Sequence, residues 1–361
     1  MEPIRVGLIG ASAANPGWGT FAHLPAIQGL SDYRLTAVST SRADTAKAAG
    51  EAYGVPGFGS ASELIQHPDV DLVVVAVKVA YHREIILEAL AAGKMVYSEW
   101  PLGVNLAEAT ELAEAATAAG VRTIIGLQGR FAPEVQYLRD LIADGYVGEV
   151  LSSSLQGTSV SWAETTTSAQ SYLFSEENGA TPLTVTTLNA LDITAAVLGE
   201  PTDLETRLTR YSRPVRVTDT GEDLTGSTPR HVSIRGRVGE APISIEYRGG
   251  TTRGEGLRWV ITGTEGELVL SSPTFNGNMQ ATELELHGGR GDDQTMNRLP
   301  VPAKYTSPEV AGIPGVAGNV ARMYEAFAGD LRTGTTNSLD FSYALERHQL
   351  IQDISEESQK H

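Results

Sequence analysis

The sequence predicts a two-domain α/β protein, in which a doubly wound parallel sheet precedes an α+β domain with an open, mainly antiparallel sheet. Three observations support this fold class. The chain has 361 residues, more than a single hydrophobic core usually accommodates. Up to about residue 127, apolar runs typical of buried strands alternate with helical patterns. After residue 149 the strands become longer, alternate apolar with polar residues, and are interrupted by few helices.

The first domain is predicted from repeated strand and helix signals. Residues 71–77 are almost continuously apolar, as expected of a central strand that is buried on both faces. Gly54 and Gly93 follow helical runs as stop signals, and Asn105 with Glu108 has the spacing of a capping box. These signals give strands at 4–9, 34–39, 71–77, 95–98 and 122–127, and helices at 23–27, 42–53, 62–67, 82–92 and 105–120. Their order is that of a Rossmann domain, assigned to residues 1–125.

The second domain is assigned to residues 126–361 from its alternating strands. Strands are predicted at 151–160, 203–211, 231–238, 242–247, 257–262 and 268–270, and helices at 184–198 and 319–331. The helix 319–331 is a candidate to pack back on the first domain. Residues 288–314 are rich in Gly, Pro, Asp and Asn, which favours a long loop.

Composition and charge exclude several classes of function. No cysteine is present, so disulfides and thiolate metal sites are excluded, and the seven histidines are too dispersed to predict a metal site. A net charge of -17 without a local basic cluster argues against binding to nucleic acid or an anionic membrane. The first residues run directly into a strand without the features of a signal peptide, and no apolar run is long enough to span a membrane. We therefore expect a cytoplasmic protein.

A glycine-containing turn after the first strand predicts a dinucleotide site. Gly7 and Gly10 stand where backbone N–H groups would approach a pyrophosphate at the start of the next helix. Ser12 and Ala13 replace the further glycines that are usual there. The alternative is that the two glycines serve only close packing between strand and helix.

The end of the second strand favours NADP over NAD, although NAD stays possible. An acidic residue there normally binds the adenosine ribose and repels a 2′-phosphate. This chain has Thr40, Ser41 and Arg42 instead, whose hydroxyls and guanidinium can bind that phosphate. The alternative is that Arg42 is merely a solvated residue in the first turn of a helix.

Several motifs together resemble a known family. They are Ala76-Val77-Lys78-Val79-Ala80-Tyr81-His82, Gly93-Lys94-Met95-Val96-Tyr97-Ser98-Glu99-Trp100-Pro101-Leu102, Gly126-Leu127-Gln128-Gly129-Arg130-Phe131-Ala132-Pro133, Gly145-Tyr146-Val147-Gly148-Glu149-Val150, Leu191-Asp192, Gly199-Glu200-Pro201 and Gly263-Thr264-Glu265-Gly266. Through these segments, which are spread over nearly its whole length, the chain resembles the glucose-fructose oxidoreductase / inositol dehydrogenase / MocA family. The resemblance implies hydride transfer between NAD(P) and a sugar, polyol or related alcohol, and homo-oligomers formed through the C-terminal sheet.

The resemblance also implies the residues of a cofactor site. Gly10, Ser12 and Ala13 would lie at the pyrophosphate, and Thr40, Ser41 and Arg42 at the adenosine ribose. The implied residues at the nicotinamide end are Lys78, His82, Glu99, Trp100 and Gln128. For Trp100 two roles stay open: an apolar packing residue beside the nicotinamide, or a platform on which a sugar stacks.

Departures from the family pattern affect its usual proton-transfer residues. Trp100 stands where the family has a lysine after the glutamate, and Val185 and Asn189 stand where an aspartate and a histidine are usual. None of these three side chains titrates usefully near neutral pH. One branch of the family, that of the fungal galactose-regulon repressor, is resembled most at Gly17-Trp18, Glu99-Trp100 and residues 127–130. The resemblance to this branch implies binding of NADP and of an activator protein.

Two functions therefore compete. The first is an oxidoreductase with rearranged acid-base residues, for which we name Lys78, whose pKa burial would lower, and Tyr172 as catalytic candidates. His82 is a third candidate, although a structural role suits it better. The second function is a non-catalytic NADP-binding sensor with a protein partner, recognised through a cleft around Trp18, Trp100 and Trp162.

Overall fold

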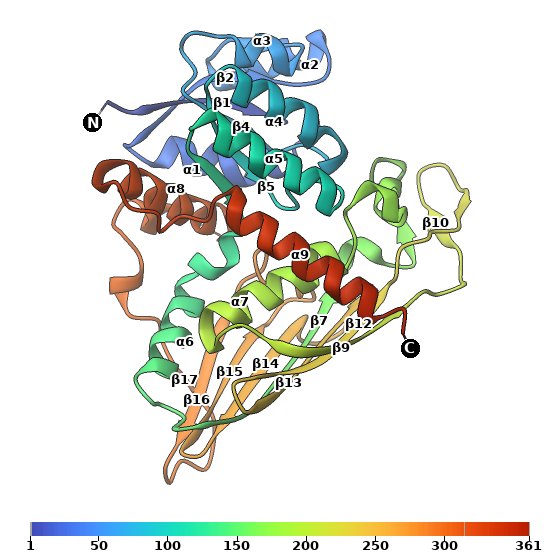
Figure 1. The fold of residues 1–361 in the computed structure, drawn as a ribbon, viewed down its shortest axis with the longest axis vertical. Coiled ribbons are helices and arrows are strands. Elements are labelled where there is room, and N and C mark those ends of the chain that lie inside the picture. Colours follow the sequence, from blue (N-terminus) through green and yellow to red (C-terminus); the bar gives the residue numbers. More distant parts are fainter. Residues whose placement is uncertain (1, 314, 361) are drawn as a thin grey trace. The chain divides into compact units, whose positions relative to one another are not determined.

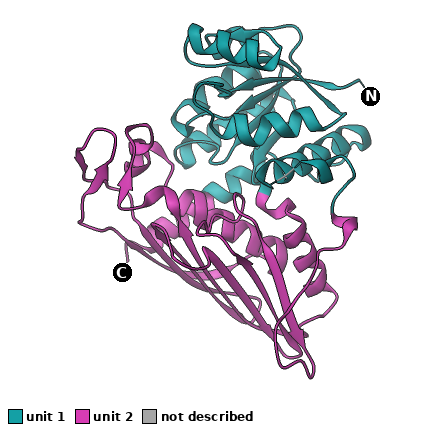
Figure 2. Ribbon diagram, turned by 180° about the vertical axis from the view of Figure 1, so that it is seen from behind, with its two compact units in different colours: residues 1–128, 306–348 teal, residues 129–305, 349–361 magenta. Residues whose placement is uncertain are grey.

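The computed structural model describes residues 2–313 and 315–360, which form two compact units (Figure 2). The first unit comprises residues 2–128, 306–313 and 315–348, and the second comprises residues 129–305 and 349–360. Within these described ranges, no helix combines the length and the apolar character needed to cross a bilayer.

A six-stranded parallel sheet forms the centre of the first unit (Figure 1). Its strand order β3-β2-β1-β4-β5-β6 reverses direction at β1, which confirms the predicted doubly wound sheet. The strands are β1 (Ile4–Ile9), β2 (Tyr33–Ser39), β3 (Gly57–Phe58), β4 (Leu72–Val75), β5 (Met95–Glu99) and β6 (Thr123–Gly126). Every residue of β4 is buried, as its apolar sequence predicts.

Helices cover the sheet of the first unit and begin and end at the residues that the sequence marks. They are α1 (Leu24–Gly29), α2 (Ala43–Tyr53), α3 (Ala61–Ile65), α4 (His82–Ala91) and α5 (Leu106–Ala119). The α5 helix begins after Asn105, whose side chain accepts a hydrogen bond from the Glu108 N–H at 3.0 Å. The α2 helix ends at Gly54, which adopts the left-handed conformation.

Two late helices, α8 (Gly315–Thr333) and α9 (Phe341–Glu357), complete this part of the chain. The α8 helix packs against α1, and its Tyr324 lies edge-on to Tyr33 at the start of β2, with ring centroids 4.8 Å apart. Asp330, near the end of α8, accepts hydrogen bonds from Thr335, Asn337 and Ser338 in the connection to α9. These bonds outweigh the effect of burial and hold the pKa of the Asp330 carboxyl below its usual range, so the carboxylate fixes the connection.

The second unit is built on an eight-stranded sheet with the order β17-β16-β15-β14-β7-β13-β12-β9. Its strands are β7 (Val150–Ser159), β9 (Thr202–Thr209), β12 (His231–Val238), β13 (Ala241–Gly249), β14 (Leu257–Gly263), β15 (Gly266–Ser272), β16 (Glu285–Arg290) and β17 (Asn297–Arg298). Only the pair β7 and β13 is parallel among these described strands, which confirms a mainly antiparallel sheet.

One face of this sheet carries the core of the second unit. Helices α6 (Pro133–Ala143) and α7 (Leu188–Leu198) pack on it, as Figure 1 shows, with side chains such as Leu155, Ile245 and Trp259 buried beneath them. The residues that alternate with these along the strands, among them Ser154 and Ser244, point to the opposite face.

The structure corrects the sequence prediction of a long loop at 288–314 over residues 288–313; residue 314 lies outside the described residues. Instead of one long loop, this region contains the end of β16, the strand β17 and the short helical turns Ala303–Tyr305 and Val310–Gly312. Gly288 was interpreted as a loop residue, but a Cβ there would lie 2.7 Å from the Tyr146 hydroxyl. The glycine therefore allows close packing within a strand. Helices α6 and α9 were also absent from the prediction.

Candidate functional site

The turn after β1 brings three strand ends together. The Gly10 N–H donates to the Ser39 carbonyl at the end of β2, at 3.0 Å. Gly10 has a φ of +99°, and a Cβ there would lie 2.4 Å from the carbonyl oxygen of Ala76, which follows β4. Only glycine fits this position, so the chain forms a narrow turn at the carboxyl edge of the sheet, where doubly wound proteins bind nucleotides.

Ser12 and Ala13 lie in this turn and are half-buried. The Ser12 carbonyl accepts a hydrogen bond from the Thr20 hydroxyl at 3.1 Å, and the Ser12 hydroxyl accepts one from the Asn15 N–H at 3.2 Å. Side-chain and backbone contacts thus hold the enlarged turn in one shape before the π turn Gly19–His23 and α1.

Thr40, Ser41 and Arg42 follow β2 at the same edge. The Thr40 hydroxyl lies 2.7 Å from that of Thr45. The exposed Arg42 guanidinium pairs with both carboxylate oxygens of Asp44, at 3.0 and 3.1 Å. A hydrogen bond from the Thr45 N–H and this ion pair lower the pKa of Asp44. An exposed ion pair is weak, so Arg42 can exchange Asp44 for a ligand phosphate.

Lys78 lies on the loop after β4, two residues beyond the Ala76 carbonyl that contacts Gly10. Its side chain is exposed. The burial that would lower its pKa, one argument for Lys78 as a base, is therefore absent, and its place at the nicotinamide end stays a prediction.

His82 is a buried structural residue. Its Nε2 lies 3.1 Å from the Val77 carbonyl and its Nδ1 lies 3.3 Å from the Ser98 hydroxyl. Burial lowers the pKa of His82, so the ring is neutral at pH 7. With both nitrogens engaged and 1% of its surface exposed, the side chain joins the ends of β4 and β5.

Glu99, at the end of β5, belongs to a buried polar chain that the sequence analysis missed. Its Oε1 lies 2.9 Å from His23 Nε2, and His23 Nδ1 lies 2.9 Å from the Tyr324 hydroxyl. A Cβ on Gly126 would lie 2.5 Å from Glu99 Oε1, so this glycine leaves room for the carboxylate. The only sequence signal was a histidine within the apolar run Ala22-His23-Leu24.

Trp100 is 6% exposed, and its ring centroid lies 4.7 Å from that of His348 in α9. Burial lowers the pKa of His348 to about 4, so the indole packs against a neutral imidazole. This burial favours the packing role of Trp100 over a platform for a sugar ring.

Gln128 follows β6 and is fully buried. Neither its Oε1 nor its Nε2 has a hydrogen-bond partner among the residues that the structure describes. A buried carboxamide without partners is costly, because it has lost its hydrogen bonds to water. This unsatisfied group and the Gly10 turn both fit a cofactor with a carboxamide at one end and a pyrophosphate in the middle.

In the second unit, the remaining side chains that the sequence analysis singled out are buried or hydrogen-bonded within the protein. Burial raises the pKa of Tyr172, which makes its phenol a proton donor rather than a base near neutral pH. Asn189 donates from its Nδ2 to the Val185 carbonyl at 2.9 Å, as a helix residue bonded to its own backbone. Trp162, which is 3% exposed, donates from its indole to the Leu173 carbonyl at 2.9 Å.

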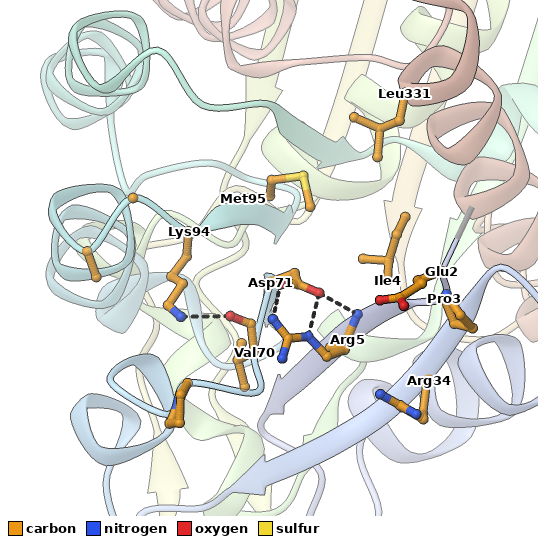
Figure 3. Close-up of a pocket in the computed structure, with 13 residues that line it drawn as sticks. Glu2, Pro3, Ile4, Arg5, Arg34, Val70, Asp71, Lys94, Met95 and Leu331 are labelled. Atoms are coloured by element: carbon orange, nitrogen blue, oxygen red, sulfur yellow. Dashed lines mark hydrogen bonds and ion pairs between the residues drawn. The ribbon is translucent and has the colours of Figure 1, made fainter.

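A cavity of about 1030 Å³ lies at the opposite edge of the parallel sheet, beside the amino ends of β1, β4 and β5 (Figure 3). Its most prominent side chain, Arg5, is already bound to Asp71 at 2.7 Å, and Lys94 donates to the Val70 carbonyl at 2.7 Å. Ligands of doubly wound sheets bind at the carboxyl ends of the strands, so this cavity does not belong to the cofactor site.

The two halves of the chain match two family descriptions. Residues 4–127 match the oxidoreductase family with an NAD-binding Rossmann fold, and residues 133–272 match the C-terminal domain of Gal80p. The first match indicates a nicotinamide cofactor.

Individual relatives include enzymes and a regulator. The dehydrogenase aclE of Aspergillus oryzae is 34% identical over 75% of this chain and 78% of its own. The regulatory protein GAL80 of Saccharomyces cerevisiae is 25% identical over 90% of this chain and 82% of its own. The crystal structure of a Gal80p super-repressor mutant superimposes with a TM-score of 0.87 at 24% identity, covering 99% of this chain and 96% of that chain.

Levoglucosan dehydrogenase in complex with NADH and L-sorbose shares the fold, with a TM-score of 0.79 at 19% identity, covering 100% of this chain and 98% of that chain. These similarities confirm the resemblance that the sequence motifs indicated. The chain belongs to the glucose-fructose oxidoreductase / inositol dehydrogenase / MocA family, near the Gal80 branch.

Proposed function

We propose that the chain is an NADP-dependent oxidoreductase that acts on a sugar, polyol or related alcohol. The observation that carries the proposal is the carboxyl edge of the parallel sheet, where the Gly10 turn follows β1 and the buried Gln128 carboxamide, without a hydrogen-bond partner among the described residues, follows β6. The 34% identity to a dehydrogenase over most of both chains supports an enzyme.

Oxidation of an alcohol requires a hydride acceptor and a base for the hydroxyl proton. A bound nicotinamide cofactor supplies the acceptor. The backbone of Gly10, Ser12 and Ala13 would hold its pyrophosphate, and the Gln128 carboxamide would orient its amide end. Arg42, released from Asp44, would bind the adenosine 2′-phosphate, which makes NADP the preferred cofactor.

Lys78 is the proposed base. It lies on the β4 loop beside the glycine turn and is exposed, so its side-chain amine, in the deprotonated form that a base requires, can reach a ligand at this edge. The pair of Glu99 and His23 lies at the end of the adjacent strand β5. Tyr172, with its raised pKa, suits hydrogen bonding to a substrate oxygen rather than proton abstraction.

The test is a turnover assay with NADP and a panel of sugars and polyols, followed through the absorbance of the reduced cofactor. We expect Lys78→Met to lower kcat at least about 100-fold, the effect of losing a general base. Lys47→Met is the matched control, because Lys47 is an exposed lysine of α2 paired with Glu51 at 3.8 Å. Equal loss of activity in both variants would contradict the role of Lys78.

A second function is favoured by the loss of the family's proton-transfer residues. The Trp100 indole is buried, and the Asn189 amide donates a hydrogen bond to the backbone of its own helix. Neither side chain can therefore take over the proton transfer of the titrating group that it replaces. The chain would then be a non-catalytic NADP-binding regulator with a protein partner. Tight NADP binding without turnover on any member of the panel would replace the enzyme proposal by this one.

A further inference from the structure

The second unit contains a cavity of about 470 Å³ lined by four arginines. It lies where the segments around β8 (Thr165–Thr166) and β10 (Val215–Val217) meet the ends of β9 and β13; Figure 1 labels β10 in the loop between β9 and β12. The arginines are Arg210, Arg213, Arg230 and Arg248. In a chain with a net charge of -17, such a concentration of cations indicates a site for an anion.

The acidic groups nearby leave part of this charge uncompensated. Glu164 lines the cavity and lies 4.0 Å from Arg213, but both side chains are more than four-fifths exposed. Arg210 pairs with Glu176 at 2.7 Å. Within residues 2–313 and 315–360, neither Arg230 nor Arg248 forms an ion pair with a carboxylate, whereas Arg248 donates to the Thr251 carbonyl at 3.2 Å.

Arg230 provides the strongest indication of a ligand. Only 5% of its surface is exposed, and its guanidinium contacts two backbone carbonyls, those of Ala163 at 3.4 Å and Arg213 at 3.2 Å. The face of the Tyr211 ring lies 5.1 Å away. Five N–H donors and a full positive charge are therefore buried against weak neutral partners, an arrangement that an anion would compensate.

The backbone around Arg230 is fixed before any ligand binds. Its N–H donates to the Thr209 carbonyl at 3.0 Å, and its carbonyl accepts from the Gly249 N–H at 2.6 Å. A Cβ on Gly249 would lie 2.2 Å from the Trp162 carbonyl, so this glycine allows the cavity walls to approach. The parallel pairing of β8 and β10 ties the two outer segments together. Such preorganisation lowers the entropic cost of binding.

We propose that this cavity binds a small phosphate monoester. A phosphate monoester carries a charge of about -1.5 to -2 at pH 7 and presents three acceptor oxygens, which suits several converging guanidinium groups better than a single carboxylate does. The cavity lies within the size range of small-molecule sites and exceeds the volume of phosphate alone. The exposed part of the Tyr211 ring supplies an apolar surface for the rest of the ligand.

The test is calorimetric titration of the full chain with glucose 6-phosphate, inorganic phosphate, citrate and glucose. We expect glucose 6-phosphate to bind more tightly than inorganic phosphate, and glucose to produce no heat of binding. Arg230→Met and Arg248→Gln should each weaken glucose 6-phosphate binding about tenfold or more, since each removes charge-assisted hydrogen bonds. Arg248 is exposed, so its variant tests the site even where Arg230→Met folds poorly.

Arg235→Gln is the matched control, because Arg235 is an exposed arginine of β12 outside the cavity lining. The proposal is overturned if none of the phosphates binds, or if the control loses as much affinity as the two cavity variants. Tighter binding of citrate overturns the choice of phosphate. Loss of NADP affinity together with glucose 6-phosphate affinity in both cavity variants would show that the arginines serve the cofactor instead.

Discussion

Buried polar side chains carry most of the functional information at the scale of single residues. A buried polar group is expensive unless its hydrogen bonds are satisfied. Glu99 and His23 satisfy each other, and His82 is satisfied by Val77 and Ser98, so these residues fix loops at the sheet edge. Among the residues that the structure describes, Gln128 has no hydrogen-bond partner for its carboxamide and Arg230 has no carboxylate partner, and these two side chains are therefore the candidates for ligand contacts.

The cofactor preference is testable at Arg42 and Asp44. Arg42→Gln should lower NADP affinity about tenfold and leave NAD affinity unchanged, because one charge-assisted contact to the 2′-phosphate is lost. Asp44→Asn removes the competing carboxylate and should raise NADP affinity by up to about fivefold, as expected for an exposed ion pair. Fluorescence titration with both cofactors measures these effects. Equal effects on NAD and NADP would contradict selection through the 2′-phosphate.

The lowered pKa of His348 predicts how the stability of the fold depends on pH. Its pKa is about 4 in the folded chain and 6.5 by the reference value, so between pH 6.5 and about pH 4 the unfolded chain binds the proton more readily than the folded chain does. Stability is therefore fully present above pH 6.5 and falls by about 3 kcal/mol as the pH approaches 4. Urea unfolding of His348→Gln should show a weaker pH dependence over this range. His287→Gln, at a half-buried position on β16, should keep the original one.

At the scale of elements, the turn after β1 shows how sequence pattern and conformation combine. The strand before Gly10 is apolar and the helix after it is well marked, so the turn is predictable. The geometry of the turn is not predictable from the local sequence. Glycine is required at position 10 because of the Ala76 carbonyl, which follows a strand distant in sequence.

Gly10→Ala should destabilise the chain by about 3 kcal/mol and abolish cofactor binding, because alanine disfavours the positive φ and its Cβ would collide with Ala76. Gly17→Ala, in the same turn, is the matched control, since a Cβ there would meet no atom within 4 Å. We expect the control to change stability by less than about 0.5 kcal/mol. Urea unfolding and cofactor titration compare the two variants, and similar losses in both would be inconsistent with the proposed cradle.

Strands and helices were predicted where one periodic pattern dominates a segment. The strand β4 and the helix α5 are such cases, with an apolar run in one and a capping box in the other. The strand β16 was missed because Gly288 and Gly289 have low intrinsic preference for strands, and tertiary packing against Tyr146 overrides that preference.

At the scale of the whole molecule, the polar face of the eight-stranded sheet is the expected surface of self-association. Ser154 and Ser244 lie side by side on β7 and β13, with their hydroxyl oxygens 3.2 Å apart. Light scattering should give the mass of a homo-oligomer. Ser244→Arg should shift it towards the monomer, because a symmetric interface would bring the introduced charges together. Gln170→Arg, on an exposed helical turn, should not. A monomeric parent chain would refute the expectation.

The fold class, the family and the position of the glycine turn were predictable from the amino-acid sequence, because strand periodicity, glycine positions and local motifs are encoded over short stretches of chain. The contacts of the individual side chains at that edge follow only from the folded chain. In the fold, Trp100 is buried against His348, Lys78 is exposed and Glu99 contacts His23. Within the described part of the chain, the Gln128 carboxamide has no hydrogen-bond partner. Burial and hydrogen-bond partners depend on residues far apart in the chain, which no local pattern specifies.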